Sequence, residues 1–403
     1  MLGRDEFRGE KTGRWIPFNQ MDGTEVRELQ SRLRDFGFYP NSEIDGIFGY
    51  ETQSSVRLFQ ENVRNGEEAI KIGTPDGIVG ANTRRELDRW NAEGKQSDWA
   101  DVSSKNPSAE FRYWMEVLKQ YRQTNLQQPV NLVVELLNAF DRPADSAKVA
   151  DWNTDSSEIH VVGIRRPEWR KNQVRQNDDL FVLLVNGLVF KFFGSTDPNP
   201  VQAKRPDEAY LIRGQHRYRF GWHKLDYMEK VYRAFRPASH GVLIGRDFDD
   251  DDVLDDEDIR KGLQANAAIN IHWSGAGTGN WSAGCQVIDG SRYISHLDKK
   301  VDCSPYAAGS YKTLPQKTRG AYNLFLDLIT AFAPDASIRN GSSILYTLIY
   351  DRDFNIPTNA GQTLIASALA ALASRFAGEE TLLDKIKKTV SIDNLVSRLI
   401  ADE

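Results

Sequence analysis

The 403-residue chain has little of what marks several classes of protein. It contains 2 cysteines, too few for the disulfide framework that stabilises small secreted domains. Its formal net charge is −6, so it has no surplus of positive charge with which to neutralise phosphate groups. This charge argues against a general nucleic-acid-binding protein. The cysteine count leaves the cellular compartment open.

Long apolar runs are also missing. The first twenty residues hold no hydrophobic segment of the kind found in a standard signal peptide. The longest weakly polar run, "TLIASALAALASRFAG" from Thr363, is shorter than a membrane span and carries Arg375. We therefore expect no membrane span and synthesis in the cytoplasm, so that any action outside the membrane would need non-classical export.

A short motif occurs twice near the N-terminus. "DGIFGYET" begins at Asp45 and "DGIVGANT" begins at Asp76, and both fit Asp-Gly-Ile-x-Gly-x-x-Thr. Asp-Gly favours a turn, because glycine adopts positive φ without steric cost, and the threonine can cap a following helix. Apolar residues at helical spacing precede the first copy: Val26, Leu29, Leu33 and Phe36. The pattern predicts helix, turn, helix, turn, helix over residues 22–92.

This repeat resembles the peptidoglycan-binding family PG_binding_1. The matching stretches are "LQSRLRDFGFYP", "IDGIFGYETQSSVRLFQ" and "PDGIVGANTRREL". The resemblance implies a small three-helix bundle that holds glycopeptide of the bacterial cell wall. A helical bundle used for contacts with other proteins is the alternative, because such modules are reused as adaptors.

After the repeat, the residue pattern changes from helical to strand-rich. Residues 93–125 are predicted to be a polar linker and a connecting helix, and residues 126–355 are rich in strands. Within them, "DDLFVLLVNGLVFKFFGS" has two β-rich runs joined by Asn186-Gly187, a strong hairpin signal. Residues 356–403 are predicted to be a helical tail, used either for packing or for docking a delivery protein.

The stretch "INIHWSGAGTGNWSAGCQVI", residues 269–288, holds one histidine and one cysteine among four glycines. A cysteine nucleophile needs a base and donors for the oxyanion. We expect His272 and Cys285 to meet on antiparallel neighbouring strands, and the backbone N–H groups of Gly284 and Cys285 to face a substrate carbonyl. A buried, unreactive cysteine in a tight loop is the alternative.

The same stretch resembles the catalytic signature of L,D-transpeptidases, the YkuD-type domain. His272 matches the upstream histidine of that family, Ser282 the Ser/Thr, Gly284 the glycine and Cys285 the nucleophile. There are two departures: Ala283 stands where the family usually has a second histidine, and the loop is shorter. The resemblance implies a β-sandwich and attack on the third-residue carbonyl of the peptidoglycan stem, with release of D-alanine. A 3-3 cross-link, D-amino-acid exchange or hydrolysis would follow.

Further residues are expected to support this site. Ser274 is expected to orient His272, and Trp273 and Trp281 to wall the cleft. Three residues from "GQHRYRFGWHK" are candidates to line the substrate cleft, although surface or core positions are the alternative: His216, Tyr218 and His223. The second cysteine, Cys303, lacks such neighbours and is interpreted as structural.

No cofactor is expected, because the chain has no His-Glu-x-x-His zinc motif. The acidic run "RDFDDDDVLDDED" places aspartates at positions 1, 3, 5, 9 and 12 of a calcium loop: Asp247, Asp249, Asp251, Asp255 and Asp258. Position 6 lacks the expected glycine and position 12 the expected glutamate. A solvated acidic loop is therefore the alternative to a calcium site.

Taken together, the sequence predicts a multidomain α+β protein. It would have an N-terminal three-helix bundle, a mainly-β sandwich catalytic domain and a helical tail. The predicted activity is that of an L,D-transpeptidase-like cysteine transferase acting at the cell wall or periplasm on peptidoglycan glycan and stem peptides. Three alternatives stay open: an L,D-carboxypeptidase or endopeptidase with the same dyad, a wall-targeting toxin delivered by an injection apparatus or derived from a phage, and a non-catalytic wall-binding adaptor.

Overall fold

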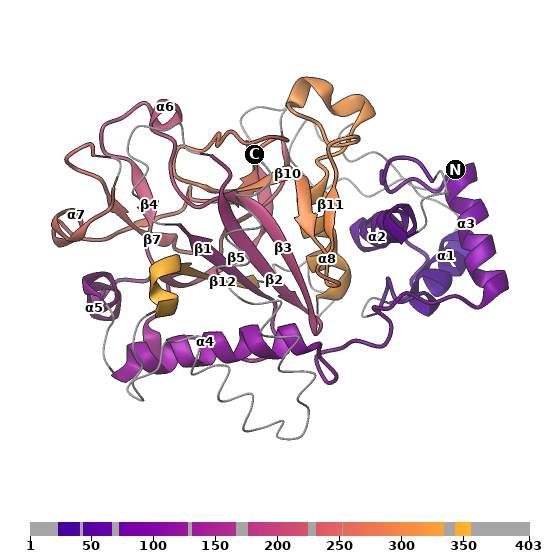
Figure 1. Ribbon diagram of the computed structural model, residues 1–403, viewed down its shortest axis with the longest axis horizontal. Coiled ribbons are helices and arrows are strands. Elements are labelled where there is room, and N and C mark those ends of the chain that lie inside the picture. The colour runs from indigo at the N-terminus through magenta and orange to yellow at the C-terminus, as the bar shows by residue number, and fades with distance from the viewer. Residues whose placement is uncertain are drawn as a thin grey trace.

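The computed structural model describes residues 23–40, 43–66, 72–127, 131–166, 176–224, 231–251, 253–333 and 343–355 (Figure 1). The predicted helical tail, residues 356–403, lies outside the described residues. The helices are α1 (Gly23–Asp35), α2 (Tyr50–Gly66), α3 (Ala81–Glu93), α4 (Ala109–Gln127), α5 (Leu132–Ala139), α6 (Pro200–Ala203), α7 (Asp256–Arg260) and α8 (Ala321–Phe332), with 3-10 turns η2 (Val149–Asp151), η3 (Tyr311–Gln316) and η5 (Asp351–Asn355). No helix among the described residues is long and apolar enough to cross a bilayer.

The strands are β1 (His160–Arg165), β2 (Asp179–Val185), β3 (Leu188–Ser195), β4 (Ala209–Leu211), β5 (Gly214–His223), β6 (Tyr232–Pro237), β7 (Val242–Arg246), β8 (Gln264–Asn266), β9 (Ile271–Trp273), β10 (Gln286–Ile294), β11 (Lys300–Asp302) and β12 (Ser343–Tyr350). The main sheet has the order β11-β10-β3-β2-β1-β12-β5-β6-β9, and β10 also pairs with β9. Eight strands therefore close into a barrel, with β11 attached to β10. A second sheet has the order β4-β7-β8.

The mixed α and β architecture agrees with the sequence prediction, but the expected sandwich is a closed sheet. The reason is the pairing of β9 with β10, which joins the two ends of the strand order. That pairing is parallel, with His272 level with Val287, so the antiparallel arrangement predicted for these two strands is wrong. The hairpin prediction is confirmed: β2 and β3 pair in antiparallel register around Asn186 and Gly187, both at positive φ.

The sequence repeat is a structural repeat. In the first copy the Gln30 amide donates to Asp45 Oδ1 at 2.9 Å, and Gly46 N–H donates to Gln30 Oε1 at 2.9 Å. In the second copy the Gln60 amide donates to Asp76 Oδ1 at 3.1 Å, and Gly77 N–H donates back at 2.8 Å. A helical glutamine thus ties each Asp-Gly turn to the preceding helix.

The repeated threonines do not cap their helices as expected. Thr52 and Thr83 are each the third residue of a helix, and their hydroxyls donate to the carbonyls of Ile47 and Ile78 at 3.1 and 3.2 Å. Each threonine therefore ties the Asp-Gly turn to the first turn of the following helix through its hydroxyl. Such local bonds from a Ser or Thr side chain to the backbone are common.

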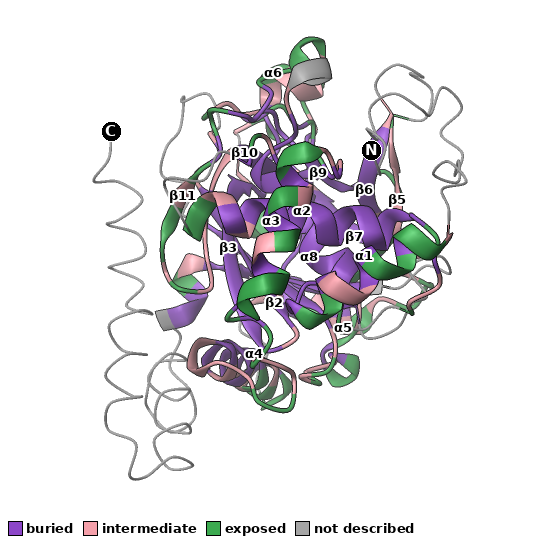
Figure 2. Ribbon diagram, turned by 90° about the vertical axis from the view of Figure 1, so that its right-hand side faces the viewer, coloured by how far each residue is buried: buried purple, intermediate pink, exposed green. Residues whose placement is uncertain are grey.

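The N-terminal helices pack against the barrel through α2. Figure 2 shows α2 and α8 as buried elements at the centre of the molecule. Arg57 of α2 donates to both carboxylate oxygens of Asp327 of α8, at 2.7 and 2.6 Å. The two side chains are 4% and 2% exposed. One continuous cluster of buried apolar residues includes Phe59 of α2 and Phe325 of α8.

The polar run after α3 also joins this core. Trp99 is buried, and its ring lies edge-on to Phe38, Phe190 and Phe332, at centroid distances of 5.1, 5.6 and 5.9 Å. Its indole N–H lies 3.0 Å from His296 Nε2. The segment interpreted as a linker therefore contributes an aromatic anchor between the N-terminal helices and the barrel.

Candidate active site

Cys285 lies immediately before β10 and is partly exposed. Because Gln286 is level with Ile271 of β9, Cys285 stands beside Asn270. Asn270 N–H points to the Cys285 sulfur at 3.4 Å, and the thiol donates to the Ala268 carbonyl at 3.4 Å. Burial raises the pKa of the Cys285 thiol, and the Asn270 N–H opposes that rise. The thiol is therefore protonated at neutral pH.

His272 lies two residues beyond Asn270 on β9, and residues two apart in a strand share a face. Its Nδ1 lies 2.9 Å from the Trp273 carbonyl and 3.1 Å from the Tyr232 hydroxyl. A carbonyl can only accept, so Nδ1 carries the proton and Nε2 keeps its lone pair. Burial lowers the pKa of His272 to about 4. At neutral pH this imidazole is uncharged and able to accept a proton.

A second imidazole lies against the first. The rings of His223 and His272 stack with a centroid distance of 4.0 Å. His223 Nδ1 lies 3.2 Å from the side-chain amide nitrogen of Asn270. Burial, and then the neighbouring His272, lower the pKa of His223 to about 2. Asn270 thus links the thiol to a pair of neutral imidazoles, and we call Cys285, Asn270, His272 and His223 the thiol cluster.

The turn before the thiol is held by its own serine. The Ser282 hydroxyl donates to the Cys285 carbonyl at 2.7 Å and accepts from Gly284 N–H at 3.0 Å. Gly284 has φ of +139°, and a Cβ there would lie 2.8 Å from the Ala209 carbonyl oxygen. Glycine is therefore required by close approach of the backbone. Because Ser282 occupies the Gly284 N–H, that group does not face a substrate carbonyl as expected.

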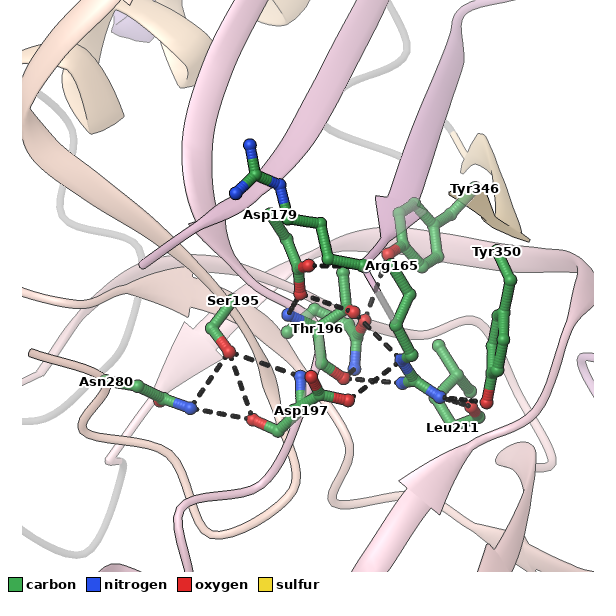
Figure 3. A network of polar contacts seen from close by, with 11 residues as sticks. Arg165, Asp179, Ser195, Thr196, Asp197, Leu211, Asn280, Tyr346 and Tyr350 are labelled. Atoms are coloured by element: carbon green, nitrogen blue, oxygen red, sulfur yellow. Dashed lines mark hydrogen bonds and ion pairs between the residues drawn. The ribbon is translucent and has the colours of Figure 1, made fainter. Parts of the chain in front are cut away.

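A buried polar network supports this turn from the barrel side (Figure 3). The Asn280 amide donates to Ser195 Oγ at 3.0 Å and to the Asp197 carbonyl at 2.8 Å, while its Oδ1 accepts from Ser282 N–H at 2.8 Å. Arg165 in turn lies 3.0 Å from Asp197 and donates to the Thr196 carbonyl at 2.6 Å. The end of β3 thereby fixes the turn that carries Cys285.

Asp179 completes the network. Its carboxylate accepts from the Thr196 N–H and hydroxyl, both at 2.7 Å, and from Arg166 N–H at 2.9 Å. Burial, followed by the nearby Asp197, raises the pKa of Asp179 to about 7. Arg165 also donates to the Tyr350 hydroxyl at 2.8 Å. Asp179 and Arg165 thereby fix the backbone at Thr196, at the end of β3 next to the thiol turn.

Several predicted site residues lie elsewhere. Ser274 donates to Asn177 Oδ1 and to the Gly279 carbonyl, both at 3.2 Å, so it secures the loop after β9 instead of orienting His272. Trp273 is buried with its ring edge-on to Tyr311 at 5.3 Å, so it does not wall an open cleft. Trp281 is 65% exposed, four residues before the thiol.

The strand β5 candidates divide between the site and the core. His223 belongs to the thiol cluster, as its stacking on His272 shows. His216 is fully buried and bonded to Ser146 Oγ at 2.7 Å and to the Ile212 carbonyl at 2.9 Å. Tyr218 is fully buried, edge-on to Tyr346 at 5.9 Å. The last two are core residues, because neither side chain is open to a ligand.

Two residues at this site are not predicted from the sequence: Asn270 of the thiol cluster, and Tyr232 beside it. Asn270 carries a signal that could have been used, since it precedes His272 by two residues on the same strand face. Tyr232, which contacts His272 Nδ1, comes from β6, 40 residues away in the chain. Nothing in the local sequence around Tyr232 indicates that contact.

The protonated thiol makes a prediction about reactivity. We expect alkylation of Cys285 by iodoacetamide to be slow at pH 7 and still rising above pH 9, because the thiolate is the reacting form and burial raises the thiol pKa. The rate is measured between pH 6 and 10 by mass spectrometry of the tryptic peptide. A plateau below pH 8 would show instead a preformed thiolate and imidazolium pair.

Comparison with known proteins concerns the N-terminal helices. Residues 22–65 match PG_binding_1, described as "Putative peptidoglycan binding domain". Residues 22–65 form a peptidoglycan-binding domain. The prediction made from the repeated Asp-Gly-Ile motif is confirmed for this part of the chain.

The chain is also similar to spore cortex-lytic enzymes. These include proteins of Bacillus cereus (44% identical over 66 residues), Bacillus subtilis strain 168 (40% over 65) and Oceanobacillus iheyensis (42% over 65). Each match covers 16% of this chain and between 19% and 22% of the relative, so the chain spans about a fifth of their length. No solved structure matches the chain.

Proposed function

We propose that this protein is a cysteine acyl-transferase of the L,D-transpeptidase type that acts on the stem peptides of peptidoglycan. The observation that carries the proposal is the tautomer of His272. Its Nδ1–H is committed to the Trp273 carbonyl at 2.9 Å, so its Nε2 is a free base on the strand beside Cys285. General-base catalysis starts from a neutral imidazole and a protonated thiol, and here the two stand on paired strands and are joined by contacts through Asn270 and His223.

The chemistry follows from those two groups. Cys285 Sγ would attack the carbonyl carbon of the third stem residue while His272 Nε2 takes the thiol proton. Collapse of the tetrahedral intermediate breaks the C–N bond, and His272 returns the proton to the departing amine of D-alanine. The resulting thioester would pass to an amine, giving a 3-3 cross-link or an exchanged D-amino acid, or to water, giving a tripeptide stem.

The substrate class rests on the N-terminal domain. That domain matches a peptidoglycan-binding family, and Arg57 and Asp327 attach it to the barrel through a buried ion pair. Glycopeptide held by the N-terminal helices would therefore stay next to the barrel. The named relatives are lytic enzymes, which supports action on cell wall, and we propose the cell wall or periplasm as the place of action.

The test is mass spectrometry of purified disaccharide-tetrapeptides incubated with the protein and with the Cys285→Ala variant. Loss of terminal D-alanine with a tripeptide product would show a carboxypeptidase. Dimers joined between third residues, or exchanged D-amino acids, would show a transpeptidase. Either product, absent with the variant, supports the thiol mechanism. Unchanged substrate with both proteins would contradict it.

The pH dependence provides a second test. A base must be unprotonated to act, and burial lowers the pKa of His272 to about 4. We therefore expect kcat/KM to stay level from pH 7 down to about pH 5 and to fall only as the pH approaches 4. Circular dichroism at each pH verifies that the protein stays folded. An acid limb centred near pH 6.5 would show that a different, unperturbed histidine is the base.

A non-catalytic adaptor is the second candidate, and two observations favour it. Ser282 occupies the Gly284 N–H, a group that acyl transfer would use, and burial raises the pKa of the Cys285 thiol. An adaptor would sediment with purified sacculi and leave every muropeptide unchanged.

Toxicity that depends on a fused signal peptide would separate a delivered toxin from an enzyme of the producing cell.

A further inference from the structure

The acidic loop between β7 and α7 brings three carboxylates together. One oxygen each of Asp247, Asp249 and Asp258 lie within 4.8 Å of one another. The loop leaves the small sheet β4-β7-β8 at Arg246 and ends in α7, on the side of the barrel away from the N-terminal helices (Figure 1). Asp258 belongs to the helix itself, so the three ligands come from both ends of the loop.

Two of these carboxylates are buried. Asp247 is 0% and Asp258 1% exposed, whereas Asp249 is exposed. Asp258 Oδ1 accepts from Phe248 N–H at 2.7 Å. Its other oxygen, Oδ2, is also buried and has no hydrogen-bond donor. A buried carboxylate oxygen without a donor carries a large desolvation cost unless a cation faces it.

Among the described ion pairs, Lys261 is the cation that contacts this group. Lys261 Nζ lies 3.7 Å from Asp258 Oδ1, the oxygen that already has a partner, and its side chain is 40% exposed. Its ammonium also lies over the Phe248 ring, 4.9 Å from the centroid. Lys261 is therefore a partly exposed cation, and its described contact is with the Asp258 oxygen that already accepts from Phe248 N–H.

Aspartates of the loop also hold its backbone, Asp247 included, whose Oδ1 accepts from Asp250 N–H at 2.9 Å. Asp255 is the N-cap of α7, and its Oδ1 accepts from Glu257 and Asp258 N–H at 2.8 and 3.1 Å. Asp251 Oδ1 accepts from Val253 N–H at 2.9 Å. Of the five aspartates expected from calcium-loop spacing, the metal-compatible group among the described residues keeps Asp247, Asp249 and Asp258 and lacks Asp251 and Asp255.

We propose that Asp247, Asp249 and Asp258 bind a calcium ion. Carboxylate oxygens at the two ends of an irregular loop suit Ca²⁺, which takes six to eight oxygen ligands in flexible geometry, and water or backbone carbonyls would complete the shell. The ion would face the orphaned Asp258 Oδ2 and neutralise the two buried carboxylates. This site is independent of the acyl-transfer chemistry proposed for Cys285.

The site has a path to the thiol cluster. From α7 the chain runs into β8, which pairs with β7, and then reaches Ala268 and Asn270. Both of these residues contact the Cys285 sulfur at 3.4 Å. A bound ion would hold the loop between β7 and α7 in place. It would thereby help to fix the positions of Ala268 and Asn270 beside the thiol.

The test uses the full chain stripped with EDTA and titrated with CaCl₂ by isothermal calorimetry. We expect one saturable site and a rise in melting temperature with Ca²⁺. Asp249→Asn removes an exposed ligand without disturbing the core, and it should weaken Ca²⁺ binding by about tenfold or more. Asp256→Asn is the matched control, since Asp256 is an exposed aspartate of α7 outside the group, and it should leave the affinity unchanged.

Asp258→Asn should abolish the saturable heat, and its fold is verified by circular dichroism. If that variant does not fold, Asp249→Asn alone decides the question. No saturable heat with the unsubstituted chain would overturn the proposal. Equal affinity of the Asp249→Asn and Asp256→Asn variants would also overturn it, as would Mg²⁺ binding as tightly as Ca²⁺.

Discussion

Substitution of Cys285 by alanine is expected to reduce product formation from tetrapeptide stems by about 10⁴-fold or more, because the attacking sulfur is removed while the rest of the thiol cluster stays in place. The side chain is small and partly exposed, and its sulfur contacts Ala268 and Asn270, so the variant should fold normally. The rate is measured as release of D-alanine, and binding to sacculi should be unchanged.

Cys303→Ala is the matched control for thiol chemistry. Cys303 is buried and accepts from the Tyr306 hydroxyl at 3.0 Å, and burial raises its pKa well above the ordinary range for a thiol. Its loss should leave kcat and KM unchanged. If Cys303→Ala lost activity while Cys285→Ala retained it, the nucleophile would be wrongly assigned.

Asp327→Asn is expected to lower the free energy of unfolding by about 3–5 kcal/mol, because it leaves the Arg57 guanidinium buried and without its counter-ion. The pair is bidentate, at 2.6 and 2.7 Å, and both side chains are almost completely buried. Urea denaturation followed by tryptophan fluorescence measures the change. Since α2 and α8 share one core, the unsubstituted chain should lose its N-terminal helices and barrel in a single transition.

The same substitution in an exposed pair is the control. Asp88 accepts from Arg32 at 2.6 Å, but these side chains are 67% and 36% exposed. Asp88→Asn should therefore cost less than about 1 kcal/mol. Similar effects of the two substitutions would show that the ion pair at the interface is not what holds the domain to the barrel.

The parts of the fold that could be predicted are those encoded locally. The Asp-Gly-Ile repeat predicts its turns because glycine must adopt φ of +76° at both Gly46 and Gly77. The Asn186-Gly187 hairpin is local in the same sense. Closure of the barrel is not, because it depends on β9 and β10 pairing in parallel across a loop whose course is fixed by contacts with Asn177 and Asp197 from distant segments.

The candidate site shows the same division. His272 and Cys285 could be paired from sequence, since they flank one glycine-rich loop. The stacking of His223 on His272 could not, because β5 and β9 are separated by β6 in the sheet and by almost fifty residues in the chain. Burial of His216 was missed for a related reason: its partner Ser146 lies 70 residues earlier, outside any strand.

The buried α2 helix has a consequence for how the molecule would work on a polymer. When a binding domain is joined by a long linker, the catalytic domain can reach many positions on the polymer around the point of binding. Here Trp99 and the Arg57–Asp327 pair hold the N-terminal helices in one position on the barrel. The distance between glycan held by those helices and Cys285 would therefore be fixed. If the proposed activity holds, the fold, and not the length of a linker, would set which stem lies within reach of Cys285.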